Sequence, residues 1–421
     1  MANVSSSNGL EKRPKLRFPG FDEPWNTALL SDYFVKSTKK NSDGMISNVI
    51  CNSAKQGLIP QREYFDKDIA NSDNTNGYYI IESNDFVYNP RKSADAPYGP
   101  ISSYQYPEAG IVSPLYLCFR AKREINPLYF EWYFRSSTWH RYIYMSGDSG
   151  ARHDRVSIKD DVFFAMPINV PSAKEQERIS LFLDAIERRI ETQRTLVETL
   201  KKYKSGLSDT LFDRTAQSPS CKIVKLGDAF ELLQNNTFSR DDLTTNPSSV
   251  QNIHYGDVLV KYGAVTNISE YTPPYIKPTI NLQKFVATSY LRDGDIVFAD
   301  TAEDYSVGKA TEIAGANGLA VLSGLHTIPC RPLMKFHPMY LAYYFNSSLF
   351  RRQIYPLVQG TKVSSISKGE LVKTSVYAPT EREQRRIASM LYLLDLRITF
   401  EEKTVNALTN TRTALLQQLF I

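Results

Sequence analysis

Three acidic residues close together, Asp300, Glu303 and Asp304, form the group in this sequence that most resembles a catalytic centre. Carboxylates at such spacing could hold a divalent metal ion for phosphodiester hydrolysis. A nuclease of that kind also needs a lysine at a fixed spacing along a strand, whereas Lys309 lies beyond a glycine turn. The acidic group alone therefore does not predict a hydrolase.

Other short motifs each lack a part that their chemistry needs. TPPY, Thr272 to Tyr275, is similar to the Asn/Asp-Pro-Pro-Tyr motif of amino-methyltransferases, but threonine holds an amino group poorly and no glycine-rich cofactor loop follows a strand. VGKA, Val307 to Ala310, lacks the earlier glycine and the hydroxyl of a P-loop. The five histidines form no cluster, and none of the four cysteines stands in a CxxC pair. We expect no catalytic residue and no metal site in this chain.

Composition bounds the class of protein. With 421 residues, 42% hydrophobic and 23% charged, the chain is long enough for two or three domains with cores of their own. It has no apolar run of about 18 residues, and residues 1–15 are predicted to be a mobile tail without a signal segment. A reducing cytoplasm is the expected compartment. The net charge of +5 permits nucleic-acid binding without arguing for it.

A repeated segment indicates the elements that would position any site. It reads PSAKEQERI from Pro171 and PTEREQRRI from Pro379, 208 positions apart (379 − 171). The two copies match at this offset, without a gap, over about forty positions. The recurring residues of the first copy are Pro171, Glu175, Gln176, Arg178, Ile179, Leu183, Arg189, Ile190, Val197, Leu200, Leu207, Leu211 and Phe212. Ser172 and Thr380 are plausible capping residues after the helix-opening prolines.

Both copies carry a heptad pattern, with seam residues at alternating steps of four and three. The pattern starts at Ile179 and Leu183 in one copy and at Ile387 and Leu391 in the other. We predict two long helices, about 60 Å each, that pair as an antiparallel coiled coil. The predicted helix-pair interface is Ile186, Ile190, Gln193, Val197, Leu200, Lys204, Leu207, Leu211, Leu394, Ile398, Glu401, Val405, Leu408, Arg412, Leu415 and Leu419.

The register of this pairing is also predicted. A pseudo-two-fold axis between Glu198 and Thr199 places Val197 opposite Leu408, and it would pair Lys204 with Glu401 and Gln193 with Arg412. Buried polar pairs of this kind fix register rather than add stability. The alternative is that each helix docks separately on its own globular half.

The repeat extends beyond the helices. LLSDYF at Leu29 matches KLGDAF at Lys225, and PLYFEWYFRSS at Pro127 matches PMYLAYYFNSS at Pro338. Only apolar, aromatic and turn positions are shared, so one scaffold carries two different surfaces. GDVLVKYG (256–263) and DGDIVFAD (293–300) are predicted strands with DFVYNP (85–90) as their counterpart, and FEWYF and LAYYF are predicted short helices. The predicted segments are a β-rich domain at 16–170, a helix at 171–213, a linker at 214–221, a second β-rich domain at 222–378 and a helix at 379–421.

Taken together, these motifs closely resemble the specificity subunits of Type I restriction–modification systems. The resemblance includes LRFPGF…W (Leu16 to Trp25), FVYNPRKS…PYG…VSPLY, GAR before the first helix, GDIVFADTAEDYSVGK (Gly294 to Lys309) and both helices. It covers nearly everything after Leu16, in family order. The fold expected is α+β, with two β-rich target recognition domains separated by two long helices in a pseudo-two-fold repeat.

The resemblance implies a non-catalytic, sequence-specific DNA-binding subunit. Each recognition domain would read one half of a bipartite, gapped site, and the helix pair would set the spacing. The expected partners are double-stranded DNA, two methyltransferase (modification) subunits and restriction/translocase subunits, with no membrane. Adenine methylation and ATP-dependent cleavage would belong to the whole complex, with S-adenosylmethionine, ATP and Mg on partner subunits.

Candidate DNA-contacting residues are polar or basic residues on loops of the two domains. A glycine turn bearing one basic residue, Gly150-Ala-Arg152 and Gly360-Thr-Lys362, precedes each helix and suits phosphate anchoring, although it could equally be a solvated turn. Tyr98 is suited to packing as well as to stacking on a base. The full set is Arg91, Lys92, Ser93, Tyr98, Arg152, His153, Lys261, Tyr262, Thr301, Glu303, Asp304, Lys309, Thr361 and Lys362.

Two other classes of function stay open at this point. A structural or interaction scaffold without DNA contact would keep the helices but would not need divergent loops. A self-contained nuclease or methyltransferase would need the missing motif parts described above.

Overall fold

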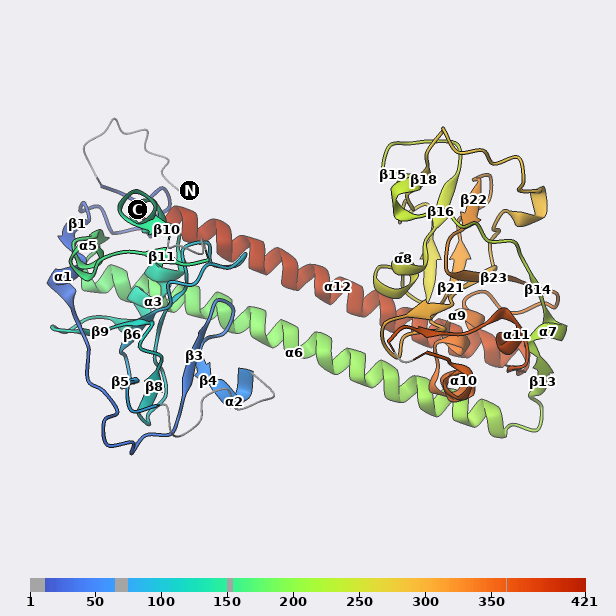
Figure 1. The fold of residues 1–421 in the computed structure, drawn as a ribbon, viewed down its shortest axis with the longest axis horizontal. Coiled ribbons are helices and arrows are strands. Elements are labelled where there is room, and N and C mark those ends of the chain that lie inside the picture. Colours follow the sequence, from blue (N-terminus) through green and yellow to red (C-terminus); the bar gives the residue numbers. More distant parts are fainter. Residues whose placement is uncertain (1–11, 65–74, 150–153, 361) are drawn as a thin grey trace. The chain divides into compact units, whose positions relative to one another are not determined.

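The computed structural model describes residues 12–64, 75–149, 154–360 and 362–421 (Figure 1). It divides into two compact units: unit 1 comprises residues 1–194 with 404–421, and unit 2 comprises residues 195–403. Each unit contains one β-rich domain and a portion of both long helices, α6 (Ala173–Gln217) and α12 (Glu381–Leu419).

Unit 1 is organised around a four-stranded antiparallel sheet in the order β2-β9-β6-β7. Its strands are β2 (Phe34–Lys36), β9 (Leu117–Ala121), β6 (Phe86–Tyr88) and β7 (Ile101–Ser103). Two-stranded pairs surround it: β1 (Asn26–Leu29) with β12 (Pro167–Val170), β3 (Ile50–Ser53) with β4 (Gly57–Pro60), β5 (Tyr79–Ile81) with β8 (Gly110–Val112), and β10 (Asp148–Ser149) with β11 (Val156–Ser157). The short helices are α1 (Leu30–Tyr33), α2 (Gln61–Tyr64), α3 (Pro127–Arg135), α4 (His140–Ser146) and α5 (Asp160–Phe164).

Unit 2 has a five-stranded sheet in the order β14-β23-β19-β21-β17 and a four-stranded sheet in the order β15-β18-β16-β22. These strands are β14 (Phe230–Leu232), β23 (Thr327–Pro332), β19 (Ile296–Ala299), β21 (Ala310–Ala314), β17 (Val265–Asn267), β15 (Leu243–Thr244), β18 (Tyr275–Ile276), β16 (Gln251–Ile253) and β22 (Val321–Ser323). Two pairs complete it: β13 (Lys222–Lys225) with β25 (Ser375–Ala378), and β20 (Thr301–Ala302) with β24 (Ser364–Ser365). The helices are α7 (Leu226–Ala229), α8 (Tyr255–Val260), α9 (Tyr340–Phe345), α10 (Ser348–Ile354) and α11 (Lys368–Leu371), with 3-10 turns at Arg240–Asp242, Ala287–Ser289 and Tyr355–Leu357.

The two units share the strand order of their main sheet, which confirms the internal repeat. The order β2-β9-β6-β7 of unit 1 recurs as β14-β23-β19-β21 in unit 2. In both units, a buried aspartate just before the central strand follows a turn residue with left-handed backbone. Arg120 donates two hydrogen bonds to Asp85, and Arg331 donates two to Asp295. Strand β6 of the first copy and β19 of the second lie where DFVYNP and DGDIVFAD predicted strands.

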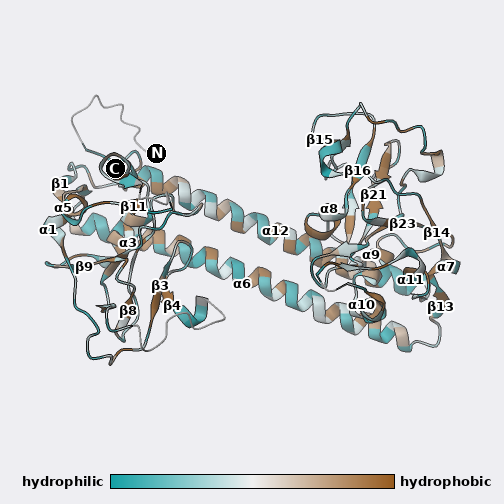
Figure 2. Ribbon diagram, viewed as in Figure 1, coloured by the Kyte–Doolittle hydropathy of each residue, from teal (hydrophilic) through white to brown (hydrophobic). Residues whose placement is uncertain are grey.

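One helix in each unit joins the sheet to the long helices. In unit 1, α3 packs Phe130 against Phe34 of the sheet, while Tyr129 and Tyr133 lie against Phe420 beyond α12. In unit 2, α9 packs Phe345 against Phe298, while Tyr340 and Tyr344 lie against Phe212 of α6. Phe212 and Phe420 are 208 positions apart (420 − 212), so the same contact is made twice. Hydrophobic residues are concentrated in these inner elements, whereas the long helices alternate in hydropathy along their length (Figure 2).

The repeated segment is explained by the way in which each long helix starts. The hydroxyls of Ser172 and Thr380 accept hydrogen bonds of 3.4 Å from the N–H groups of Glu175 and Glu383. The side-chain amide of Gln176 then donates to the carbonyl of Pro171 at 2.9 Å, and Gln384 does the same to Pro379. Both glutamines are buried, so each fold-back bond satisfies a carbonyl that water does not reach. The repeated glutamine is therefore a structural element of the helix start.

Within each unit, α6 and α12 lie side by side and antiparallel (Figure 1). In unit 2, Lys201 pairs with Glu402 at 2.9 Å and Lys204 pairs with Asp395, so the partner number falls as the α6 number rises. In unit 1, Glu187 pairs with Arg412. All residues of the predicted helix-pair interface are buried or half-buried. The architecture is α+β with a paired-helix element, as predicted.

The predicted polar pairs are wrong in detail. Lys204 pairs with Asp395 rather than Glu401, and Arg412 pairs with Glu187 rather than Gln193. Asp395 and Glu187 directly follow the seam residues Leu394 and Ile186, so they flank the seam. A long basic side chain reaches such a flanking carboxylate while its stem stays buried and its charge stays near water. Glu401, which is 4% exposed, pairs with Arg397 of its own helix. The two observed pairs are themselves copies at the 208-residue offset (395 − 187 and 412 − 204).

Two local predictions also differ from the structure. The segment 256–263 was expected to be a strand, but Tyr255–Val260 is helix α8. His254 accepts the N–H of Gly256 at 3.2 Å and Asp257 in the first turn bonds Arg240, and both contacts favour a helix start. The predicted linker 214–221 is helical as far as Gln217, because burial of Thr215 and packing of Ala216 on the core stabilise the added turn.

Candidate nucleic-acid interface

The two predicted recognition loops occupy the same place in the scaffold. After β6, Arg91 forms an isolated antiparallel bridge with Arg155; after β19, Thr301 is paired with Ser365. Both members shift by 210 positions between the copies (301 − 91 and 365 − 155). Equivalent backbone positions therefore carry arginines in unit 1 and hydroxyl residues in unit 2.

In unit 1 this loop borders a groove of about 870 Å³. The walls are the turn between β3 and β4, the loop after β6, and residues from the segment before β9. The backbone of the loop is fixed by three hydrogen bonds: Arg91 N–H to Asn89 Oδ1 at 3.1 Å, Lys92 N–H to the Asp154 carbonyl at 2.8 Å, and Val156 N–H to the Pro90 carbonyl at 2.9 Å. The loop is thus held in one conformation before any ligand arrives.

Two asparagines hold the opposite wall of the groove in place. The amide of Asn52 donates to the Val87 carbonyl at 2.7 Å and its oxygen accepts the Ser102 hydroxyl at 2.9 Å. The amide of Asn89 donates to the Asn52 carbonyl at 3.2 Å. These bonds tie the β3–β4 hairpin to the sheet, so both amides are used structurally and the cationic side chains are the groups that can serve a ligand.

The charge of the groove is strongly positive. Its lining includes Lys55, Arg91, Lys92 and Arg155 against the single carboxylate of Asp95. Lys55 and Asp95 lie 3.6 Å apart and are both exposed. Within the residues that the structure describes, no hydrogen bond or ion pair engages the side chains of Arg91, Lys92 or Arg155. Three cations therefore remain available to an anionic ligand.

The equivalent loop of unit 2 has the opposite character. The hydroxyl of Thr301 donates to Asp300 at 2.7 Å, and His326 lies 3.4 Å from the same carboxylate. Glu303 and Asp304 are exposed. Hydrogen bonds from the side chain and the backbone N–H of Ser306 lower the pKa of Asp304, so this carboxylate is charged at neutral pH. The loop offers acceptors where the unit 1 loop offers donors.

Three of the predicted contact residues, Tyr262, Lys309 and Tyr98, make structural contacts. Tyr262 is 6% exposed within a hydrophobic cluster, and burial raises its pKa. Lys309 is half-buried and donates to the Leu259 carbonyl at 2.8 Å, and burial lowers its pKa. Tyr98 is half-buried with its ring 4.9 Å from that of His140 and packs on the core of unit 1. These side chains therefore help to hold the loops in place, and their contact with DNA stays a prediction.

The other predicted residues lie on the surface or beyond the described part. Lys362 and Lys261 are exposed, and Lys261 pairs with Asp257 at 3.1 Å. Burial alone would raise the pKa of Asp257, but hydrogen bonds from Arg240 and Lys261 outweigh burial and lower it. Arg152, His153 and Thr361 fall outside the described residues. The contact with DNA of every predicted residue stays a prediction.

Sequence reasoning missed Lys55 and Arg155. Lys55 stands in SAKQG, a turn between two short apolar runs, and Arg155 stands in HDRV before a strand. The lysine in a polar turn was a usable signal. The meeting of the two residues in one groove could not be read from the sequence, because they are 100 positions apart (155 − 55).

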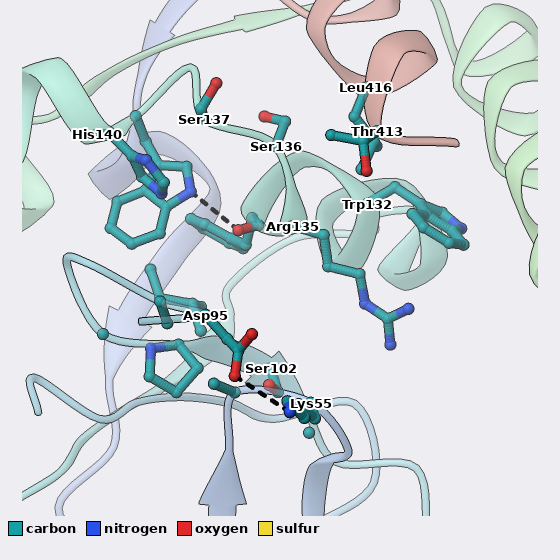
Figure 3. Close-up of a pocket in the computed structure, with 18 of the residues that line it drawn as sticks. Lys55, Asp95, Ser102, Trp132, Arg135, Ser136, Ser137, His140, Thr413 and Leu416 are labelled. Carbon is teal, nitrogen blue, oxygen red and sulfur yellow. Dashed lines mark hydrogen bonds and ion pairs between the residues drawn. The ribbon is translucent and has the colours of Figure 1, made fainter. Parts of the chain in front are cut away.

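Each unit has a hollow of a second kind, between the β-rich domain and the helix pair. In unit 1 its volume is about 340 Å³, and Figure 3 shows Ser136, Ser137 and His140 of the domain together with Thr413 and Leu416 of α12 around it. In unit 2 the volume is about 600 Å³. The lining positions correspond at offsets of 211 (343 − 132) or 208 (395 − 187). The matched pairs are Trp132 and Tyr343, Ser136 and Ser347, Ser137 and Ser348, His140 and Arg351, Glu187 and Asp395, and Arg412 and Lys204.

Other kinds of site receive no support from the described residues. Among residues 12–64, 75–149, 154–360 and 362–421, no group of three or more His, Cys, Asp or Glu side chains is placed to hold a metal ion. In the same ranges, every helix is too short or too polar to cross a bilayer.

Comparison with known proteins shows the fold. No family model and no curated protein matches the sequence. Among solved structures, one from a study titled for the complex assembly and conformational transition of the type I R-M system matches with a TM-score of 0.60 and 18% identity, over 95% of this chain and 98% of that chain. The HsdS subunit from Thermoanaerobacter tengcongensis matches with a TM-score of 0.50 and 17% identity over 97% and 98% of the two chains. The Type-I restriction-modification system S subunit from M. genitalium matches with a TM-score of 0.52 and 14% identity over 97% and 99%.

The chain therefore has the fold of Type I restriction–modification S subunits over nearly its whole length. At such low identity the likeness concerns the fold, and the function is argued separately below.

Proposed function

We propose that this chain is the DNA-recognition (specificity) subunit of a Type I restriction–modification complex. The observation that carries the proposal is the duplicated scaffold, which presents a cationic loop in one unit and an acidic loop at the equivalent place in the other. A scaffold that keeps its frame and changes its loops suits two readers of different DNA half-sites. The full-length fold likeness to S subunits supports the same conclusion.

The paired helices would set the distance between the two half-sites. An α-helix rises about 1.5 Å per residue, so a pair of this length acts as a spacer over several turns of contact. Cross-helix ion pairs at equivalent places, Glu187 with Arg412 and Asp395 with Lys204, fix the pairing in both units. A gapped site with two unlike halves follows from two unlike readers on one spacer.

The two matched hollows are the places where we propose that modification subunits dock. Each is lined by a β-rich domain and by both long helices of its unit, so a protein seated there contacts the reader and the spacer together. Because each unit has such a hollow, two copies of one partner would bind in equivalent ways. Restriction subunits would join this assembly.

This chain would bind DNA and leave the chemistry to its partners. S-adenosylmethionine, ATP and Mg would be held by those subunits, which would carry out adenine methylation and ATP-dependent cleavage. A scaffold without DNA contact is the alternative, and the charge of the unit 1 groove favours the DNA-binding role over it.

The proposal is tested by fluorescence anisotropy of the purified chain with random-sequence duplex DNA at two salt concentrations. A DNA-binding subunit loses affinity steeply as salt rises, because phosphate contacts release counterions. Absence of binding at low salt would favour the scaffold. The chain is then incubated with S-adenosylmethionine and DNA, with and without a modification subunit. Methyl transfer by the chain alone would contradict the non-catalytic role, whereas transfer only in the mixture supports the proposal.

A further inference from the structure

The unit 1 groove contains an arrangement of charge that the fold alone does not explain. Arg91 and Arg155 are partners across an antiparallel bridge, with Lys92 next to the first of them. Like charges directly opposite each other on paired strands destabilise the pair. Within the part of the chain that the structure describes, no carboxylate pairs with any of these three side chains. Such an arrangement is stabilised when an anion is bound.

The equivalent positions of unit 2 lack this arrangement. Thr301 and Ser365 replace the two arginines, and Ala302 replaces Lys92 (302 − 92 = 210). The next exposed side chains are Glu303 and Asp304, which would repel a phosphate. Among the described residues, the same frame therefore presents three cations without a carboxylate partner in one copy and two exposed carboxylates in the other.

We propose that Arg91, Lys92 and Arg155, with Lys55 on the opposite wall, form a site for the phosphate backbone of duplex DNA, and that the equivalent loop of unit 2 does not. This inference rests on the proposed function, since it assumes that the chain binds DNA. The two loops then differ in role: the loop after β6 in unit 1 binds the duplex electrostatically, and the loop after β19 in unit 2 contributes little to the salt-dependent part of the affinity.

The site suits a sugar-phosphate strand. A phosphate strand is a line of anions, and a groove of about 870 Å³ with cations on both walls can follow several of them. Hydrogen bonds fix the main chain of the loop at both arginines, which limits the backbone entropy lost on association. Arginine and lysine both serve phosphate, arginine through two nitrogens and lysine as a point charge.

The test measures the dissociation constant of the full chain for a random-sequence duplex as a function of KCl concentration. Each phosphate contact contributes about 0.9 to the slope of log K against log salt, so the triple variant R91A/K92A/R155A should reduce the slope by about 2 to 3. At 0.15 M salt each contact corresponds to about fivefold in affinity, and the triple variant should bind about 10²-fold more weakly. The double variant R91K/R155K keeps the charges and should bind within a few-fold of the parent.

The matched comparison is T301A/S365A at the equivalent positions of unit 2. It removes no charge, so the slope should stay the same whether or not Thr301 contacts a base. An unchanged slope in R91A/K92A/R155A would overturn the inference while leaving the proposed function intact, provided that the parent binds DNA. A loss seen only on the cognate site, with no change of slope on random DNA, would also overturn it, because the residues would then read bases. Failure of the parent itself to bind any duplex would instead contradict the proposed function.

Discussion

The ion pair between Glu187 and Arg412 gives a quantitative test of how the two long helices are paired in unit 1. Their side chains are 28% and 22% exposed, so the pair is only partly screened by water. Two unit charges about 4 Å apart attract by roughly 4 kcal/mol at an effective dielectric constant of 20, before solvation costs. Exposed pairs retain 1 kcal/mol or less in double-mutant cycles, and we expect about 1 to 2 kcal/mol for this less exposed pair.

The perturbation is a charge swap. Glu187→Arg and Arg412→Glu should each destabilise unit 1 because like charges then face each other, and the double variant E187R/R412E should recover most of the loss. The chain has three tryptophans, Trp25, Trp132 and Trp139, and all belong to unit 1. Tryptophan fluorescence during urea unfolding therefore reports on unit 1 alone.

The pseudo-equivalent swap K204D/D395K lies in unit 2 and should change the tryptophan transition much less. Additive effects of Glu187→Arg and Arg412→Glu, with no recovery in the double variant, would refute this pairing. Coupling of Arg412 to Gln193 instead would restore the register that the heptad pattern alone suggested.

Three further predictions concern stability. Burial raises the pKa of Glu312 to about 7 from an ordinary value of 4.5, despite hydrogen bonds from the N–H groups of Met339 and Ala342. Its protonated form is therefore favoured in the folded state, so the contribution of this carboxyl to stability is full below pH 4.5 and falls by about 3 kcal/mol as the pH rises to about 7. Circular-dichroism melts of Glu312→Gln should lose this part of the pH dependence, and an identical slope between pH 4.5 and 7 would contradict the reasoning. Gln176→Ala should lower the free energy of unfolding by about 1 kcal/mol, because it leaves a buried carbonyl without a hydrogen-bond donor. Gln384→Ala should lower it more, because that side chain also accepts the His337 N–H at 2.8 Å. Equal shifts of the melting temperature would argue against the bond to His337. Gly99 has φ +83°, and a Cβ there would lie 2.1 Å from the Asn89 carbonyl oxygen. Gly99→Ala should therefore lower the free energy of unfolding by about 2 kcal/mol or more and weaken DNA binding. The control Gly20→Ala has φ +87° and open space, so it should lower the free energy of unfolding by about 1 kcal/mol and leave binding unchanged.

The long helices could be predicted because their signal is long and periodic. A gap-free repeat at 208 positions and a heptad seam identify both helices and their capping residues, and the structure agrees on Ser172 and Thr380. The cross-helix partners could not be predicted, since Asp395 and Glu187 lie outside the seam and are chosen by side-chain reach.

The short run VLV at 258–260 fits a strand or a helix, and contacts of His254 and Asp257 with residues outside the run favour the helix.

The candidate site was only partly predictable from the sequence. The loop after β6 was predicted from its position after a strand and from its basic residues. Its partner Arg155 and the opposite-wall Lys55 come from distant segments, and only the fold brings them together.

The most direct test of the central claim is the gap length of the DNA motif that this chain specifies. The protein is reconstituted with its modification subunit, and methylated adenines are mapped for the parent and for a variant that lacks residues 193–199 and their equivalents, 401–407. Removing one heptad from both helices shortens the pair by about 10 Å, which corresponds to about three base pairs of duplex. We predict a two-part motif whose halves stay the same while the gap shortens by about three base pairs. A motif without a gap, or a gap of unchanged length in the shortened variant, would contradict the account.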